Sequence, residues 1–260
     1  MNPRNGPRTD EILKVVRRGG VITNEGLAVH LKVSIATVRR DLQDLEERGL
    51  LRRTHGGAIP IEPLFYEPFR HDSSFQEQTG RNAEEKRRIG LAAAAMIQEG
   101  DIIAVTPGTT ATEVVRNLHH LRGVTVVTST VNVAMELTNR KDIEVFLTGG
   151  YLRGHWFSLV GPTAVQAARR VFPDKMFIGV NGIHAEHGLT SLDEEEAELI
   201  SVMMQQSKQR IVVADHTKLG TVATQLIAPV ERIQALITGV EASADQLAPF
   251  SGTAMEVVRV

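Results

Sequence analysis

Apolar residues in the first 50 positions recur at the three- and four-residue spacing of short amphipathic helices. A first helix is predicted across 10–18, with Thr9 as its N-cap and Gly19 as its end. A second is predicted to begin at Thr23 or Asn24. The apolar side chains that this second helix would bury are Leu27, Ala28 and Leu31.

A third helix and a β-hairpin complete this first region. Ser34 is the predicted N-cap of the helix and Gly49 its end. The apolar positions between them fall at i, i+4 and i+7: Val38, Leu42 and Leu45. Residues 50–59 then have the pattern of two short strands that turn at 55–57. The order of elements predicts a helix-turn-helix followed by a wing.

Beyond residue 80, short β-branched runs alternate with helical stretches. The predicted strands are 102–106, 124–128, 143–147, 175–180, 210–214 and 235–238. The predicted helices are 83–98, 112–121, 131–139, 163–171 and 194–208. This alternation implies an α/β domain with a mostly parallel sheet that helices cover on both faces.

The two patterns are separated by a segment without clear periodicity. It begins after Pro60 and contains two more prolines, Pro63 and Pro68, which favour a linker. We therefore expect a winged helix-turn-helix at 1–60, a linker at 61–80 and a larger α/β domain at 81–260.

Composition narrows the class of protein. The 260 residues include no Cys, which excludes disulfides and thiolate metal sites and makes a cytoplasmic protein the expectation. No apolar run approaches the roughly 18 residues of a membrane span, and no signal peptide precedes the first helix. Aromatic residues are 4%, too few for platforms that stack single-stranded nucleic acid.

Charge is distributed unevenly along the chain. Residues 1–60 carry 11 Lys and Arg against 7 Asp and Glu, a net charge of +4. Residues 61–260 carry 18 against 24, a net charge of −6, and the two parts give the −2 of the whole chain. A basic head on an acidic body is a hint that the head meets an anionic partner.

The third predicted helix has the chemistry of a DNA-recognition helix. Its outer face offers hydrogen-bond donors to base edges and phosphates, and its N-terminal turn is the part that usually enters the major groove. The candidate DNA-contacting residues of this helix and the wing are Ser34, Ala36, Thr37, Arg39, Arg40, Gln43, Arg53, His55 and Gly56. A protein-interaction module with a solvated charged face is the alternative.

The sequence of the third helix and the wing resembles that of the DeoR family of bacterial transcriptional regulators. Residues 33–42 read VSIATVRRDL, and 55–58 read HGGA, as in the family's helix and wing signatures. The resemblance implies binding to double-stranded operator DNA. Two positions depart from the pattern: Lys32 stands where the family often has Gly, which tolerates a positive φ better, and Ala36 replaces a longer polar residue.

Loops with phosphate-binding chemistry follow several predicted strands. Gly108, Thr109 and Thr110 would bring backbone amides, hydroxyls and a helix N-terminus onto one phosphate, although an ordinary strand-to-helix turn has the same pattern. Because the carboxyl ends of parallel strands line one edge, we expect the loops to converge. The candidate effector-binding residues are Gly108, Thr109, Thr110, Thr128, Ser129, Gly149, Gly150, Arg153, Asn181, Gly182, Glu195, Asp215 and Lys218.

This second region resembles the DeoR C-terminal effector domain, which is related to ribose-5-phosphate isomerase folds. The motifs that carry the resemblance include the GTT loop, TGGYLR at 148–153, FIGVNGI at 177–183 and ADHTKLG at 214–220. The resemblance implies a phosphorylated sugar or sugar alcohol as effector, no cofactor, and a homodimer or homotetramer. Thr106 and Pro107 depart from the family's Asp and small residue, and Asp193 from its Asn, so sugar selectivity is expected to differ.

The sequence thus predicts a cytoplasmic bacterial regulator of sugar catabolism, in most cases a repressor, located on the nucleoid when bound to DNA. The alternative is a phosphosugar isomerase fused to a DNA-binding head, with Glu195 or Asp215 as the base and Lys218 stabilising an enediolate. The missing acid at Thr106 argues against turnover. No metal site is expected, because His184, His187 and His216 lack the usual ligand spacing.

Overall fold

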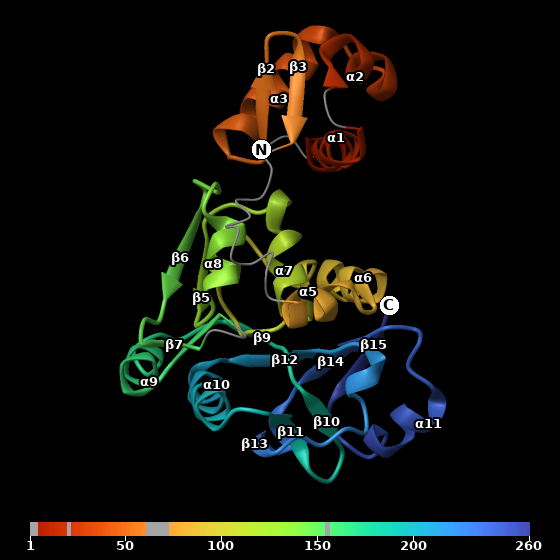
Figure 1. The fold of residues 1–260 in the computed structure, drawn as a ribbon. Coiled ribbons are helices and arrows are strands. Elements are labelled where there is room, and N and C mark those ends of the chain that lie inside the picture. The colour runs from red at the N-terminus through yellow and green to blue at the C-terminus, as the bar shows by residue number, and fades with distance from the viewer. Residues whose placement is uncertain (1–4, 20–21, 61–72, 154–156) are drawn as a thin grey trace.

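The computed structural model describes residues 5–19, 22–60, 73–153 and 157–260 (Figure 1). The N-terminal head contains three helices and a three-stranded antiparallel sheet in the order β1-β3-β2. Their bounds are α1 (Asn5–Gly19), β1 (Ile22–Thr23), α2 (Asn24–Leu31), α3 (Ile35–Glu47), β2 (Leu51–Thr54) and β3 (Gly57–Pro60). This is the predicted winged helix-turn-helix.

Helix starts in the head were predicted with one error. Ser34 caps α3 by accepting a hydrogen bond from the Thr37 amide (3.1 Å), as expected. Of the two predicted starts of α2, Asn24 is the first helical residue, and Thr23 is its cap, accepting from the Gly26 amide (3.1 Å). The predicted cap Thr9 is wrong, because α1 begins at Asn5 and Thr9 lies inside it. A proline is tolerated in a first helical turn, so Pro7 does not delay the helix.

A small core and one ion pair hold the head together. Side chains from all three helices and the wing are buried in it: Ile12, Leu13, Val16, Leu27, Ala28, Val38, Leu42, Leu45, Leu51 and Ala58. Two guanidinium nitrogens of Arg8 in α1 donate hydrogen bonds to the buried carboxylate of Asp41 in α3, at 2.6 and 2.9 Å. This bidentate contact fixes the angle between the two helices.

The turn between α2 and α3 carries backbone strain. Lys32 caps α2 in the left-handed conformation (φ 54°, ψ 44°), which an L side chain adopts at a cost of roughly 1–2 kcal/mol. Replacing Lys32 by Gly is therefore expected to stabilise the protein by about 0.5–1 kcal/mol, since part of the relief is lost to the greater freedom of unfolded glycine. Chemical denaturation of the full chain measures the difference.

The matched control is the same replacement at Lys14, an exposed position inside α1. Glycine in a helix interior costs about 1 kcal/mol, so this variant is expected to be less stable than the wild type. Destabilisation by both replacements would contradict the assignment of strain to Lys32.

The larger domain is built on a seven-stranded parallel sheet in the order β15-β14-β12-β9-β4-β5-β6. The strands are β4 (Ile102–Val105), β5 (Val124–Thr128), β6 (Ile143–Leu147), β9 (Lys175–Ile178), β12 (Gln209–Val213), β14 (Ala235–Thr238) and β15 (Glu256–Arg259). Six of them match the predicted strands, and β15 was not predicted. Its sequence is only Glu-Val-Val-Arg, and no helix was predicted between it and the strand before it, so it did not fit the alternation of strands and helices.

Helices cover both faces of this sheet, as predicted. The chain supplies α6 (Ala83–Ala94), α7 (Thr109–Arg116), η1 (Leu118–His120), α8 (Val131–Leu137), α9 (Pro162–Ala168), α10 (Glu194–Gln206) and α11 (Ala244–Leu247). Consecutive residues of each strand point to opposite faces, so Phe177 packs in the cluster under α6–α8 while Met176 and Ile178 pack under α9 and α10. Figure 1 shows the two layers.

Smaller elements complete the domain. Two antiparallel sheets have the orders β10-β11-β13 and β7-β8. Their strands are β7 (Tyr151–Arg153), β8 (Ser158–Val160), β10 (Gly182–His184), β11 (Gly188–Ser191) and β13 (Gln225–Ala228), and short 3-10 turns lie at η2 (His216–Lys218), η3 (Val230–Arg232) and η4 (Ala248–Phe250). Within the segment expected as a linker, 73–80 forms helix α5 (Ser73–Gly80). In the part of the chain that the structure describes, no helix has the length and apolar character needed to cross a membrane.

Strand order places a topological switch point in the middle of the sheet. From β4 the chain proceeds outward through β5 to the edge strand β6, whereas from the adjacent β9 it proceeds the other way through β12 and β14 to β15. The loops after β4 and β9 therefore diverge and leave a crevice at the carboxyl ends of the strands, where ligands bind in open α/β sheets.

Candidate functional site

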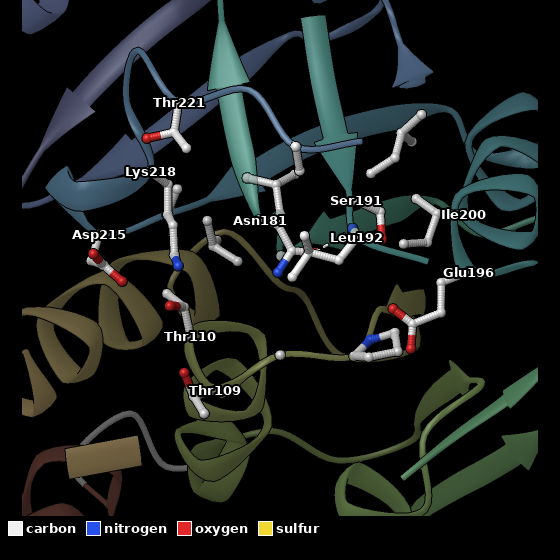
Figure 2. A pocket seen from close by; sticks show the side chains of 18 of the residues that line it. Thr109, Thr110, Asn181, Ser191, Leu192, Glu196, Ile200, Asp215, Lys218 and Thr221 are labelled. Atoms are coloured by element: carbon white, nitrogen blue, oxygen red, sulfur yellow. Dashed lines mark hydrogen bonds between the residues drawn. The ribbon is translucent and has the colours of Figure 1, made fainter. Parts of the chain in front are cut away.

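A cavity of about 360 Å³ lies at this switch point, a volume in the range of small-molecule sites. Its walls come from the loops after three adjacent strands, β4, β9 and β12, together with the start of α10 and a residue of α5 (Figure 2). The polar side chains among the lining residues are Gln78, Lys86, Thr109, Thr110, Asn181, Ser191, Asp193, Glu196, Asp215, Lys218 and Thr221. The cavity thus has an extended polar wall.

One end of the cavity is formed by the first turn of α7. Gly108 is the residue before this helix and has φ 127°, a conformation that side chains rarely permit. Its carbonyl accepts the Thr112 amide (2.9 Å), so the amides of the first turn remain directed out of the helix end. In Figure 2 the Lys218 amine points toward Thr109 and Thr110. Amides, hydroxyls and an ammonium group together suit an anion.

A second lysine, Lys86 of α6, lines the same end and was not predicted as a site residue. Its side chain is buried, and its Nζ donates to the backbone oxygen of Gln78 in α5. Burial lowers the pKa of Lys86, because the charged amine is poorly solvated there. An anion in the cavity would relieve this cost.

Asp215 is buried and lies close enough to both lysines for their charges to act on its carboxyl. Burial opposes its ionisation, but hydrogen bonds from Thr217 and the charges of Lys86 and Lys218 prevail and lower the pKa of its carboxyl. Its Oδ1 also accepts from Asn82 Nδ2 (3.2 Å). The carboxylate is therefore held ionised, and the two lysines together leave this end of the cavity with positive charge in excess.

The opposite end offers hydrogen bonds in a less charged setting. Asn181 Oδ1 accepts the Leu192 amide (3.1 Å), which leaves the amide NH2 of Asn181 as a donor toward the cavity (Figure 2). Burial raises the pKa of Glu196, whose carboxylate accepts from Ser158. Asp193 caps α10 through the Glu196 amide (2.9 Å). Such groups suit sugar hydroxyls.

The predicted effector residues fall into two groups. Gly108, Thr109, Thr110, Asn181, Asp215 and Lys218 line the cavity. Seven others do not lie among its lining residues: Thr128, Ser129, Gly149, Gly150, Arg153, Gly182 and Glu195. The first four lie at the ends of β5 and β6, which are one and two strands away from the crevice.

The remaining three have other contacts. Arg153 and Glu195 form an ion pair with each other, and Glu195 lines a separate, open depression beside Gly161. Gly182 packs so closely on the Thr221 backbone that a Cβ would lie 2.3 Å from its oxygen. None of the three residues contributes a group to the cavity wall.

Thr106, the departure from the family pattern, is buried behind the cavity. Its Oγ1 accepts the Gly179 amide (2.8 Å) and donates to the Pro107 oxygen (3.2 Å). The hydroxyl thereby joins the loops after β4 and β9 at the switch point. An uncharged residue thus holds the loops together at this position.

Among the residues that the structure describes, two clusters have side chains close enough to hold a cation: His184 with Glu186 and His187, and Glu85 with Asp215 and His216. In the first, His184 Nδ1 accepts the backbone amides of Glu186 (3.2 Å) and His187 (3.4 Å). In the second, Glu85 accepts the His216 amide and ring nitrogen, both at 2.8 Å. A metal would have to displace these bonds, so we assign neither cluster to a metal.

The head presents an exposed basic surface. Ser34, Ala36, Arg39, Arg40 and Gln43 of the α3 segment are exposed, and so are Arg53, His55 and Gly56 in the wing, whereas Thr37 is half-buried. Ser34 and Thr37 share a hydrogen bond between their hydroxyls (2.8 Å).

Two of the four acids of α3, Asp41 and Asp44, lie away from this surface, whereas Glu46 pairs with Arg53 of the wing at 3.9 Å. Asp41 turns to Arg8, and Asp44 turns to Arg48 and to Arg122 of the larger domain. The exposed half of α3 therefore keeps the charge of Arg39 and Arg40.

Comparison with known proteins agrees with both halves of the molecule. Residues 8–63 match the DeoR-like helix-turn-helix domain, and residues 81–240 match the DeoR C terminal sensor domain. The chain is 36% identical over 251 residues to the HTH-type transcriptional regulator GlpR of Haloferax volcanii, covering 96% of each protein. It is also 36% identical to the HTH-type transcriptional repressor GlcR of Bacillus subtilis, covering 87% of this chain and 85% of that protein.

Among solved structures, ribose 5-phosphate isomerase A from Methanocaldococcus jannaschii is similar over 53% of this chain and 54% of its own, with a TM-score of 0.39 and 14% sequence identity.

Proposed function

Because this chain belongs to the DeoR family of helix-turn-helix transcriptional regulators, we propose that it represses a sugar-catabolism operon under the control of a phosphorylated sugar or sugar alcohol. The effector binds in the cavity at the β4/β9 switch point, and operator DNA binds to the exposed half of α3 and the wing. The family membership confirms the resemblance seen in the sequence motifs.

The main support for a phosphorylated effector is the pair of lysines near the first turn of α7. In Figure 2 Lys218 lies beside Thr109 and Thr110, and Lys86 lines the same cavity close enough for the charges of Lys218 and Asp215 to act on its amine. Asp215 neutralises only part of their charge. A phosphate dianion supplies the missing charge and accepts several hydrogen bonds at once.

The sugar part of the effector extends toward α10. We assign its hydroxyl groups there to Asn181 and to Glu196, which takes the place of the neighbouring Glu195, whose carboxylate pairs with Arg153. Asp215 accepts from a hydroxyl group next to the phosphate. Leu192 and Ile200 supply apolar surface for the carbon skeleton. Thr106 joins the loops after β4 and β9, and Asp193 caps α10, so these two departures from the family pattern affect the shape of the cavity and thereby which sugar fits.

DNA recognition by this fold uses two heads. We propose a homodimer or homotetramer whose heads read half-sites one helical turn apart, about 34–36 Å, with α3 in the major groove. Such a regulator acts in the cytoplasm, on the nucleoid. Arg39 and Arg40 are placed to contact base edges or phosphates, and the wing residues Arg53 and His55 to contact the flanking backbone.

Neither Asp215 nor Glu195, the two carboxylates named as the base of an isomerase, is well placed for that role. Isomerisation needs a base that is free to accept a proton within hydrogen-bond reach of the substrate carbon. The pKa of Asp215 is lowered, and its Oδ1 already accepts hydrogen bonds from Asn82 and Thr217. Glu195, the other proposed base, is paired with Arg153 outside the cavity lining. Both carboxylates therefore serve as structural or binding groups.

A thermal-shift screen against sugars, sugar alcohols and their phosphates tests the proposed function. A ligand at 100 times its Kd stabilises the native state by about 2.7 kcal/mol, which raises the Tm by several degrees. We expect a rise with one phosphorylated compound and none with its unphosphorylated parent. Equal shifts with both, or none with any phosphate, would overturn the assignment of an anion site to α7.

A further inference from the structure

The sensor domain holds the C-terminal end of the recognition helix through buried charge. Arg48, the cap of α3, is 8% exposed, and its Nε donates to Asp142 Oδ2 of the sensor domain (3.1 Å). Another guanidinium nitrogen donates to the backbone oxygen of His119. One turn earlier, Asp44 accepts Arg122 Nη2 (2.6 Å). The orientation of α3 is thus set partly by the sensor.

Two further contacts support this docking. Asp10 of α1 lies 3.3 Å from His119 Nε2, and its hydrogen bond to this ring is the main reason why the pKa of Asp10 is lowered. Gly49, which ends α3, lies directly against the backbone of Asn139, where an added Cβ would be 1.6 Å from the carbonyl oxygen. The two domains therefore meet along α1 as well as α3.

His119 belongs to the same stretch of chain that forms the phosphate end of the cavity. Helix α7 begins at Thr109 and runs from the sheet toward the head (Figure 1), and η1 (Leu118–His120) follows it directly. Asn117 closes the junction by donating to the Glu113 oxygen (2.8 Å). Arg116 ties α7 to Glu136 of α8. A displacement of the first turn is therefore carried along a short rigid element to His119.

The docked arrangement contains an unsatisfied group at its centre. His119 Nδ1 is buried and has no hydrogen-bond partner among the described residues. A buried polar atom without a partner costs free energy that a different arrangement recovers. The Arg48–Asp142 ion pair favours the docked arrangement, because breaking it costs free energy. One contribution thus favours docking of the head and the other disfavours it, as is needed for two arrangements of similar free energy.

We propose that α7 and η1 couple the cavity to the recognition helix: an anion seated on the first turn of α7 shifts η1 and loosens its contacts with Asp10 and Arg48. The coupling rests on the proposed function, because it uses the same cavity. It is reciprocal, so contacts between the domains alter the affinity of the cavity for its ligand although they lie outside it.

The test uses inorganic phosphate as the probe and the full chain. The absence of Cys allows two spin labels to be attached through Val29→Cys on α2 and Leu91→Cys on α6, both exposed positions. We expect phosphate to change the distance distribution between the labels. A distribution that saturating phosphate leaves unchanged overturns the coupling.

A second measurement does not depend on the labels. Phosphate affinity, measured by calorimetry, is expected to change at least threefold in Arg48→Gln and in Asp10→Ala. The matched control Arg52→Gln, an exposed arginine of the wing, is expected to change it less than 1.5-fold. If phosphate binds equally to all three variants and the wild type, the coupling is wrong and the proposed function stands. If phosphate does not bind to the wild type, the proposed function fails and the coupling with it.

Discussion

Arg39→Ala is expected to weaken binding to operator DNA by about 5- to 150-fold, the loss typical of an arginine that reads a base with two hydrogen bonds. Arg39 is exposed on the second turn of α3, beyond the N-terminal turn capped by Ser34. The acids that would offset its charge face other partners, with Asp41 on Arg8 and Asp44 on Arg48 and Arg122. Fluorescence anisotropy with a duplex selected by the wild-type protein from a random library measures the change.

The control for Arg39→Ala is Arg87→Ala. Arg87 is an exposed arginine on α6 whose side chain pairs with Glu84 at 3.6 Å, so its loss removes the same charge from the sensor domain. We expect less than a twofold change in DNA affinity. Equal losses in the two variants would mean that net charge, and not the position of Arg39, determines binding. Loss of effector binding in Arg39→Ala would mean that the two domains are not separable.

Lys218→Ala is expected to lower effector affinity by about 10- to 150-fold, the range for a hydrogen bond to a charged group, while DNA binding without effector stays intact. The ammonium of Lys218 points at the first turn of α7, where the phosphate is placed. Thr109→Ala removes a hydroxyl from the same turn and is expected to blunt the response in the same direction. Calorimetry with the effector found in the screen, and anisotropy of the DNA complex, measure the two properties.

Lys208→Ala is the matched control for Lys218. Its side chain is 71% exposed and pairs with Asp174 (2.7 Å), away from the cavity lining. Effector affinity is expected to stay within twofold of the wild type. An unchanged affinity in Lys218→Ala would place the phosphate elsewhere.

Local signals predicted most of the fold. The caps Thr23 and Ser34 and the end of α3 at Gly49 follow from side-chain and backbone chemistry within a few residues, and the structure confirms them. The positive φ expected to be awkward at Lys32 is present. The β-branched runs predicted six of the seven strands, because strands buried on both faces need such residues throughout.

The sequence around each residue does not tell whether that residue lines the cavity, because this depends on the order of the strands in the sheet. Loops after β4, β9 and β12 converge since these strands are neighbours, whereas β5 and β6 carry Ser129 and Gly149 toward the edge. Lys86 lies in a helix before β4, outside the loops after strands from which the candidate residues were chosen. Glu195 and Glu196 are consecutive, and adjacent helical positions differ by about 100° in direction, so an acidic run does not tell which carboxylate faces inward.

Helix α3 divides into a half that faces DNA and a half that faces the sensor. The first contains positions 34–40, and the second contains Asp44, Arg48 and the close backbone contact at Gly49. Substitutions in the first half can therefore redirect the protein to a new operator during evolution without changing which metabolite controls it. After gene duplication, two copies could acquire separate target genes under one common signal. A chimera that exchanges heads between relatives must, by the same reasoning, take residues 44–49 from the parent that supplies the sensor.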